Sequence, residues 1–382
     1  MSENSAGMFE SCPARIISLG ESVHGSQSLH SLITQQARLL SSVSGQSNEV
    51  QSIGLEIPSS AGEALNLACS EGSPKDIDEA LGLSYRIFRS PPFVGFFTWL
   101  QSENRRRREI GHSIIEIYGF DIRDVWIQRQ RILDNAKLAA HISTNTRRYL
   151  QNLSKEEFYR LEWAALKGQL STEENDMMAS AAADIKKLAD ADPKESYETA
   201  CRSVSEMLGC LSSANGNYFE LNRLRDAAMA RNVSQHAEKT DGRNLLIGHL
   251  THLSELSLDQ QIPEVSYRSP KGMGQILREK YGEDYACFGF TFRQGQYVRT
   301  TGEVVDVKAS SKSIEGSVPQ SSFEQGTFTI SKENLPADKY FGHFEIVSGS
   351  DDDDSRDPLK GPLAQCLSGI VISQTSEAFR LP

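Results

Sequence analysis

Short apolar runs, each ended by glycine, proline or a polar turn, recur along this chain of 382 residues. Such runs are typical of strands whose two faces are both covered, as in the sheet of an α/β domain. We expect strands at Arg15–Leu19, Ser52–Ile57, Ser113–Tyr118, Asn244–Ile247, Tyr285–Phe292 and Gly369–Ser373. Apolar residues at helical spacing predict helices at Leu29–Leu40, Gly62–Ala68 and Met273–Tyr281. This alternation predicts an α/β fold with a mostly parallel central sheet flanked by helices.

The stretch from Val125 to Glu238 has a different pattern. It carries no strand signal, and its apolar residues recur every three to four positions. Clusters of proline, glycine, serine and asparagine interrupt it near 152–154, 191–193 and 212–217. We therefore predict an α/β catalytic core formed by residues 1–124 and 239–382, and an inserted all-helical lobe formed by residues 125–238.

The composition favours small-molecule chemistry. A net charge of −11 would repel nucleic acid and anionic membranes. No stretch approaches the ~20 apolar residues that span a bilayer, and the first residues lack the pattern of a secretory signal. We expect a cytoplasmic protein whose partner is a small molecule, with neither nucleic acid nor membrane bound.

Cysteines and charge runs add little to this picture. The six cysteines are scattered without zinc-site spacing, so we interpret them as reduced, mostly buried thiols. The run Arg105–Arg108 is interpreted as meeting solvent and scattered acids, not a phosphate. Past Phe292 the chain turns polar and irregular, and Ser310–Ser313 and Asp351–Asp354 are expected to be surface loops.

The first candidate site lies at the end of the first predicted strand. There the sequence Gly20-Glu-Ser-Val-His24 places an acid and an imidazole three residues apart. Ligands bind outside the carboxyl ends of parallel strands, so Glu21 and His24 would be delivered there. A neutral histidine can accept a proton from water, and a carboxylate can hold its tautomer. A lone histidine at a strand end is as often a structural hydrogen-bonding group.

Two further strand ends carry ionisable groups. Glu56 lies in the apolar run Ile53–Pro58, where a carboxylate must be paired or hydrogen-bonded. The run that begins at Asn244 ends in His249, followed by His252. Three strand ends would thus bring acids and imidazoles to one edge of the sheet, which is what an active site requires.

With these segments in place, the chain resembles the erythromycin esterase family over nearly its whole length. Seven blocks stand in the order that the family shows: Gly20–His24, Leu55–Pro58, Tyr118–Asp121, Arg225–Ala230, His249–His252, Met273–Arg278 and Gly289–Phe292. The resemblance implies an α/β fold whose helical lobe covers a deep cleft. It also implies hydrolysis of an ester or lactone of a natural-product-like small molecule by a histidine-activated water, without a covalent intermediate.

The resemblance implies a role for each site residue. His24 would be the general base with Glu21 as its partner, Glu56 would orient the water or a proton, and His249 would polarise the carbonyl. No cofactor and no metal are expected. The residues expected around the substrate are Ser22, Asp121, His252, Met273 and Gln275.

Two departures from the family pattern suggest a substrate other than erythromycin. Leu250 stands where the family usually has asparagine, directly after the first paired histidine. An arginine common on the helix after the first motif has no clear match, since Ile33, Thr34 and Gln35 occupy that region and Arg38 comes late.

Other readings of the same residues remain open. Ser22 as a serine-hydrolase nucleophile would need a second glycine where His24 stands. His24, Glu56 and His249 could instead form a zinc or manganese site. The same base could serve an acyl transferase or cyclase that makes a secondary metabolite, because the sequence does not separate water from an alcohol as the nucleophile. A non-catalytic binding homologue is the remaining alternative.

Overall fold

The structure is a computed structural model that divides the chain into two compact units. One unit contains residues 1–57, 61–120 and 230–382, and the other contains residues 58–60 and 121–229. The residues that the structure describes are 8–9, 11–42, 49–191, 197–255, 259–262, 265–266, 271–299, 302–309, 311, 313–323, 326–336, 359–360 and 363–379.

The first unit is built on a sheet whose strand order is β3-β2-β4-β1-β7-β11-β9, with β8 paired to β7. The pairs β2/β4, β4/β1, β1/β7 and β7/β11 are parallel, which confirms the predicted mostly parallel α/β fold. Every predicted strand is present: β1 (Ile16–Glu21), β2 (Val50–Pro58), β3 (Glu116–Asp121), β4 (Arg243–His249), β7 (Tyr285–Val298) and β11 (Gly369–Ser376). A small separate sheet joins β5 (Asp259–Ile262), β6 (Val265–Ser266) and β10 (Leu359–Lys360).

Strand β1 lies between β4 and β7, and all six of its residues are buried. A strand buried on both faces must be apolar, which explains the continuous run Ile16–Leu19. The functional residues follow where that run ends. The sheet thus holds the end of β1 in its interior, with a paired strand on each side.

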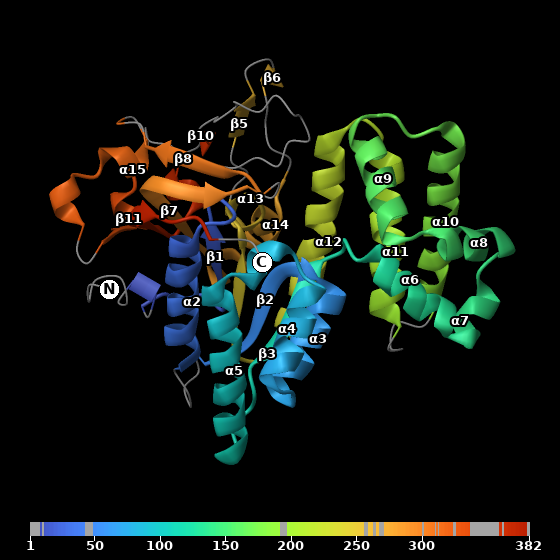
Figure 1. Ribbon diagram of the computed structural model, residues 1–382, viewed down its shortest axis with the longest axis horizontal. Helices are drawn as coiled ribbons and strands as arrows, with labels where there is room; N and C mark the ends of the chain where they lie inside the picture. The colour runs from blue at the N-terminus through green and yellow to red at the C-terminus, as the bar shows by residue number, and fades with distance from the viewer. Residues whose placement is uncertain are drawn as a thin grey trace. The chain divides into compact units, whose positions relative to one another are not determined.

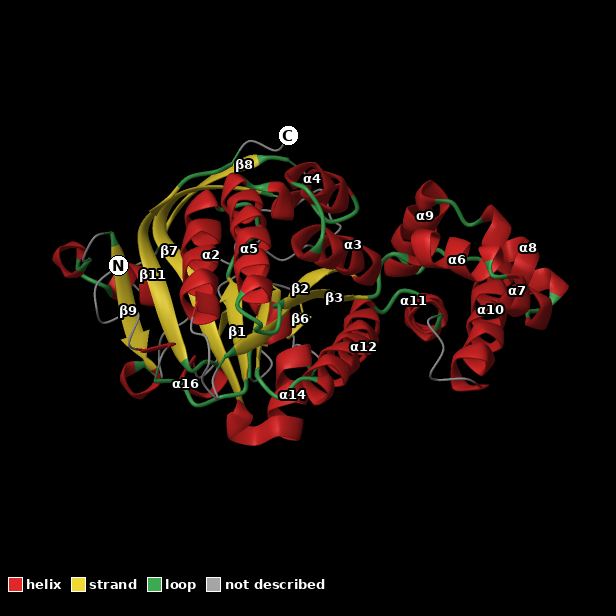
Figure 2. Ribbon diagram, turned by 90° about the horizontal axis from the view of Figure 1, so that it is seen from below, coloured by secondary structure: helices red, strands yellow, loops and turns green. Residues whose placement is uncertain are grey.

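Helices cover this sheet, as Figures 1 and 2 show. The predicted helices correspond to α2 (Gln27–Ser42), α3 (Ser59–Ser70) and α14 (Met273–Tyr281). Helix α2 packs on β1, β7 and β11 beside α5 (Pro91–Glu109). The remaining helices and turns of this unit are α4 (Pro74–Gly82), η1 (Arg86–Arg89), α13 (Leu250–Leu253), η2 (Gly282–Asp284), α15 (Ile314–Ser317), η3 (Gln320–Ser322), η4 (Lys332–Asn334) and α16 (Leu363–Cys366).

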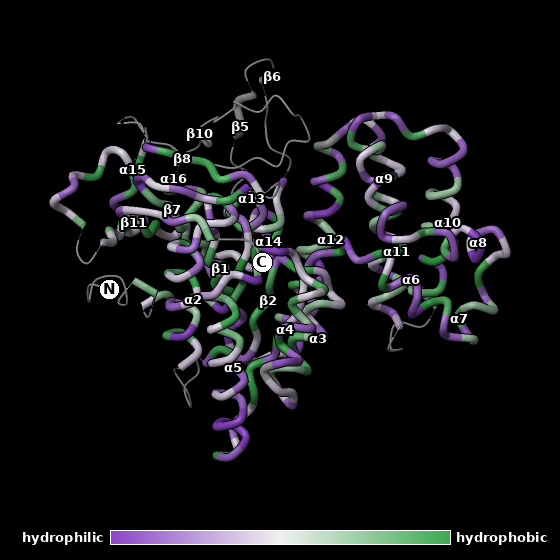
Figure 3. Tube along the Cα trace, viewed as in Figure 1, coloured by the Kyte–Doolittle hydropathy of each residue, from purple (hydrophilic) through white to green (hydrophobic). Residues whose placement is uncertain are grey.

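The end of α5 accounts for the arginine run. Figure 3 shows hydrophilic residues gathered at the far end of this helix. Arg106 and Arg107 both pair with Glu103, and the buried Arg107 also binds Glu49 through a 2.6 Å contact. Acids and backbone carbonyls therefore satisfy these two guanidinium groups, in line with the prediction from sequence.

The prediction of irregular chain past Phe292 is wrong. Strand β7 continues to Val298 and pairs antiparallel with β8 (Val304–Lys308), while β9 (Thr327–Ser331) pairs antiparallel with β11. Polar residues alternate there because one face of the strand is partly exposed. Ser313 is fully buried and not a surface residue, since its hydroxyl caps α15 by accepting from the Gly316 amide. Residues 351–354 lie outside the described residues.

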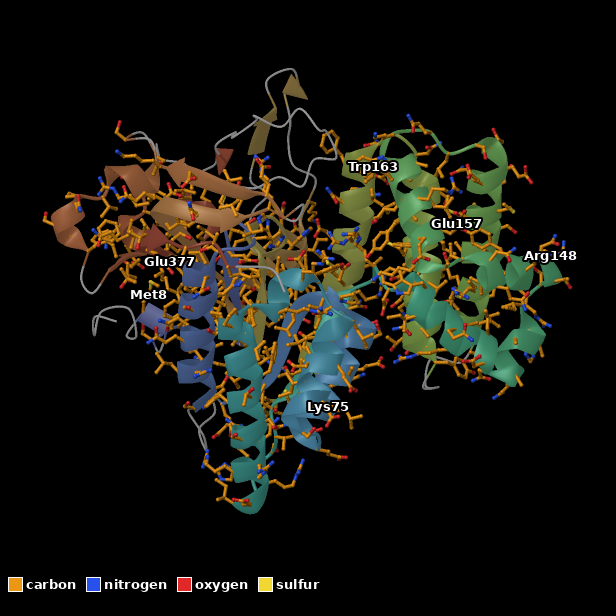
Figure 4. All side chains as sticks on the ribbon, viewed as in Figure 1. Met8, Lys75, Arg148, Glu157, Trp163 and Glu377 are labelled. Atoms are coloured by element: carbon orange, nitrogen blue, oxygen red, sulfur yellow. The ribbon has the colours of Figure 1, made fainter. Side chains whose placement is uncertain are left out.

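The second unit is helical throughout its described residues from Val125 onward. Its helices are α6 (Val125–Asp134), α7 (Ala136–His141), α8 (Thr144–Asn152), α9 (Lys155–Leu166), α10 (Thr172–Ala191), α11 (Glu198–Ala214) and the first part of α12 (Tyr218–Lys239). They enclose a core of their own that includes Leu150, Phe158, Ile185 and Leu208. A groove of about 1040 Å³ lies between α8, α9 and α10, and Arg148 and Glu157, marked in Figure 4, are on its lining.

The boundary between the units falls inside α12, after Met229. From Ala230 onward the helix packs on the sheet: Asn232 donates to the Phe120 carbonyl, and the His236 ring stacks on Tyr118. The division at 124/125 and 238/239 stays a prediction. Within the described residues, no helix combines the length and apolarity needed to cross a bilayer.

Candidate active site

The candidate site lies at the carboxyl ends of three neighbouring strands, in the order β2-β4-β1. Glu21 is the last residue of β1, and its register partner on β4 is His249. On the other side of β4, Leu55 pairs with Ile247, so Glu56 follows at the level of Gly248. The sheet register therefore brings Glu21, His249 and Glu56 to one edge, as the sequence predicts.

Two paired glycines make this edge possible. Gly20 and Gly248 are register partners on β1 and β4. A Cβ on Gly248 would lie 2.9 Å from the Cβ and from a carboxylate oxygen of Glu56. A Cβ on Gly20 would lie 2.6 Å from Leu250, which is fully buried. Leu250 thus fills the space over Gly20 as a core residue, so this position has no polar contact to offer.

The Glu21 carboxylate joins two imidazoles. Its Oε1 is 2.7 Å from His24 Nδ1, and its Oε2 is 3.0 Å from His30 Nε2. Burial raises the pKa of the Glu21 carboxyl, but the charge of His30 and the hydrogen bonds from both imidazoles lower it to about 2. Glu21 is therefore ionised at neutral pH and can accept hydrogen bonds through both oxygens.

His30 was not singled out from the sequence. It is fully buried on α2, with its Nδ1 2.8 Å from the Ser90 hydroxyl and its ring against Phe93 and Phe379. The signal that could have found it is a histidine within the apolar stripe of a predicted helix, between Leu29 and Ile33. A polar residue in such a stripe needs a buried partner.

The turn that carries His24 is fixed by Gly25. This glycine has a φ of +74°, and a Cβ there would lie 2.0 Å from the Val298 carbonyl oxygen. The Val298 amide donates to the Gly25 carbonyl at 3.1 Å, so the turn is tied to the end of β7. His24 keeps a side-chain exposure of 12%, and its ring centroid is 4.6 Å from that of His249.

His249 is held as a neutral ring. Burial, and after it the charge of His24, holds the pKa of His249 well below its usual range. Its Nδ1 accepts from the Thr251 amide and lies 2.8 Å from the Thr251 hydroxyl, which places the ring proton on Nε2. His249 is thus suited to donate a hydrogen bond and not to act as a cation.

Glu56 connects the two paired histidines. Its Oε2 accepts from the His249 amide at 2.7 Å, and its Oε1 lies 3.4 Å from His252 Nε2. Only 6% of Glu56 is exposed, so these partners satisfy a carboxylate that would otherwise be costly to bury. Of the predicted catalytic residues, the structure therefore places Glu21, His24, Glu56 and His249 together.

The predicted substrate-contacting residues lie in different environments. Ser22 is fully buried, and its hydroxyl has no hydrogen-bond partner among the described residues. Met273 is buried at the start of α14, whose Gly274 packs against the Leu253 carbonyl four residues past His249. Gln275 is half-buried, and its amide lies 3.4 Å from Glu279.

Asp121 belongs to the helical unit. Its carboxylate is fully buried and accepts two hydrogen bonds from Arg225, at 2.9 and 2.8 Å. An ion pair of this kind satisfies both charged groups. Substrate contact by Asp121 stays a prediction. In the described part of the chain, no three histidine, cysteine, aspartate or glutamate side chains are arranged as metal ligands.

Comparisons with solved structures show the fold. A Bacillus cereus protein covers the whole chain, with 92% of its own length matched, a TM-score of 0.74 and 17% identity. A succinoglycan biosynthesis protein gives a TM-score of 0.73 at 15% identity, again over 100% of this chain and 92% of its own. A mutant of erythromycin esterase EreC in its open conformation gives a TM-score of 0.61 at 17% identity, over 97% of this chain and 92% of its own.

The family comparison is more specific. A search of curated proteins finds no match. The family model for erythromycin esterase matches residues 47–374, a range that includes Glu56 and His249 and begins after Glu21 and His24. Because that range covers most of the chain, the assignment follows: this protein belongs to the erythromycin esterase family.

Proposed function

We propose that this esterase-type hydrolase cleaves an ester or lactone of a natural-product-like small molecule, with His24 as the base that activates water. The observation that carries the proposal is the 2.7 Å contact between Glu21 and His24 Nδ1 at the carboxyl end of β1. An ionised carboxylate accepts the Nδ1 proton, so the basic lone pair of the ring is on Nε2. His24 is also the more exposed of the two adjoining imidazoles.

In the proposed step, a water oxygen attacks the carbonyl carbon while its proton passes to His24 Nε2. The tetrahedral intermediate then expels the alcohol oxygen, which takes the proton from the imidazolium as the C–O bond breaks. Glu21 stabilises the imidazolium that forms between these two events. A neutral His249 suits a donor to the carbonyl oxygen, and Glu56 holds the His249 backbone in place.

Ser22 is not proposed as a nucleophile. A serine nucleophile is hydrogen-bonded to the base that removes its proton. The Ser22 hydroxyl is buried and has no such bond among the described residues, and the Ser22 amide donates to the Phe290 carbonyl at 2.9 Å. We therefore propose direct attack by water, without an acyl-enzyme.

Turnover of aryl esters and of macrocyclic lactones by His24→Ala tests the proposal. We expect a loss of about 100- to 10,000-fold in kcat with an unchanged fold. His141→Ala is the matched control, because His141 is exposed on α7 and bonds only to the Lys137 carbonyl one turn away. Near-normal turnover by His24→Ala would remove the base assignment. An acyl-enzyme found by intact-mass analysis under turnover would remove direct water attack.

A further inference from the structure

His30 is the one imidazole of the Glu21 cluster that the proposed reaction leaves without a role. Glu21 divides its two oxygens between His24 and His30, at 2.7 and 3.0 Å. The two imidazoles therefore share one carboxylate. Any change in how His30 holds Oε2 alters the charge that Oε1 presents to His24.

The surroundings of His30 fix its orientation. The ring has no solvent exposure and lies against Phe93 and Phe379, with centroid distances of 4.9 and 5.4 Å. The Ser90 hydroxyl, 2.8 Å from Nδ1, can donate to that nitrogen, so that the Nε2 proton points at Glu21. Ser90 uses its hydroxyl for this and not as a side-chain cap of α5.

We propose that His30 is a positioning residue: its Nε2–H fixes the Glu21 carboxylate and thereby keeps His24 in the unprotonated form that a base requires at neutral pH. This proposal rests on the function proposed for His24. It adds that the strength of the base is set from α2, two hydrogen bonds away from the reacting water. The donor is an imidazole enclosed in aromatic rings, so its geometry does not depend on solvent.

The direction of the effect follows from charge. A buried carboxylate that loses one of its two donors is stabilised only by the remaining one. The Glu21–His24 pair would then hold its proton to higher pH, whichever of the two groups carries it. Within the described contacts, the titratable groups that face His30 are Glu21 and, beyond it, His24; Ser90, Phe93 and Phe379 carry no charge.

The test compares His30→Phe, which keeps an aromatic ring but removes the donor, with His30→Gln, whose amide can still donate to Glu21. In His30→Phe, the acidic limb of the kcat/KM profile should move up by about one pH unit, with about tenfold lower kcat/KM below it. His30→Gln should stay close to the parent profile. Thr34→Val is the control, since Thr34 is buried on the same helix and bonds only to helix carbonyls.

A second readout does not need activity. The ring nitrogens of His24, followed by ¹⁵N NMR across pH, should titrate at higher pH in His30→Phe than in the parent protein. Superimposed His24 titrations would overturn the proposal, even if the protein turned over no ester at all. Should His30→Phe fail to fold, Ser90→Ala carries the test, with a smaller shift in the same direction expected and an unshifted titration counting against the proposal.

Discussion

Glu21 and His249 are register partners at the ends of two neighbouring parallel strands. Their separation is therefore set by backbone hydrogen bonds of the sheet and not by a loop. His24 follows three residues after Glu21, and its ring comes to rest 4.6 Å from His249. Groups held on strand ends keep a geometry that catalysis can use without reordering.

Glu21→Gln should impair turnover far more than substrate binding. The amide can donate to His24 Nδ1, which would move the ring proton to Nε2 and remove the basic lone pair. We expect kcat to fall by about 100- to 10,000-fold with little change in KM, as expected for loss of the correct tautomer. Steady-state kinetics on one ester substrate measures both constants. A loss confined to KM would mean that Glu21 binds substrate.

Gly248→Ala should damage the site through packing alone. The new methyl group would meet Glu56 at 2.9 Å, and Glu56 is held by the His249 amide. Displacing that carboxylate should lower the free energy of unfolding by about 1–3 kcal/mol and reduce kcat. Urea unfolding and kinetics measure the two effects. Gly209→Ala is the control, because a Cβ there meets nothing within 4 Å.

The strand ends explain how much of the site could be predicted from sequence. Glu21, Glu56 and His249 each follow or interrupt an apolar run, and parallel strands bring such positions to one edge. His30 could not be assigned this way, because its contact with Glu21 depends on how α2 docks on the sheet. The extension of β7 to Val298 was missed because its partly exposed face carries polar residues.

Chelators should leave activity unchanged. Both oxygens of Glu21 are taken by imidazoles, and both oxygens of Glu56 by the His249 amide and His252. Neither carboxylate is therefore available in this arrangement as a metal ligand. Assays after dialysis against EDTA and against dipicolinate test this. Activity that disappears and returns with one particular divalent ion would favour the two-histidine, one-carboxylate alternative.

Asp121→Asn should destabilise the helical unit. Asp121 and Arg225 are both buried and joined by two hydrogen bonds, so neutralising the carboxylate leaves a guanidinium without its counter-charge. Breaking such a pair costs about 3–5 kcal/mol. Thermal unfolding of Asp121→Asn measures the loss, and the exposed pair partner Glu220→Gln is the control. Unchanged stability with a raised KM would instead favour the substrate contact predicted from the sequence.

His236 should make the protein less stable in mild acid. Its ring stacks on Tyr118 with 3.8 Å between centroids, and burial, followed by the charge of Lys239, lowers its pKa from 6.5 to about 4. Because the folded pKa is the lower one, the unfolded chain binds the proton first. The contribution of this group is complete above pH 6.5 and is lost as the pH falls toward about 4.

The size of that loss can be isolated with His236→Phe, which keeps an aromatic ring on Tyr118 but does not titrate. Between pH 7 and pH 4, the parent protein should lose about 3 kcal/mol more unfolding free energy than the variant. His249, whose pKa is also lowered by burial, contributes equally to both proteins and cancels in the comparison. Urea unfolding at several pH values gives the difference, and parallel curves for the two proteins would show that His236 is not held neutral by its burial.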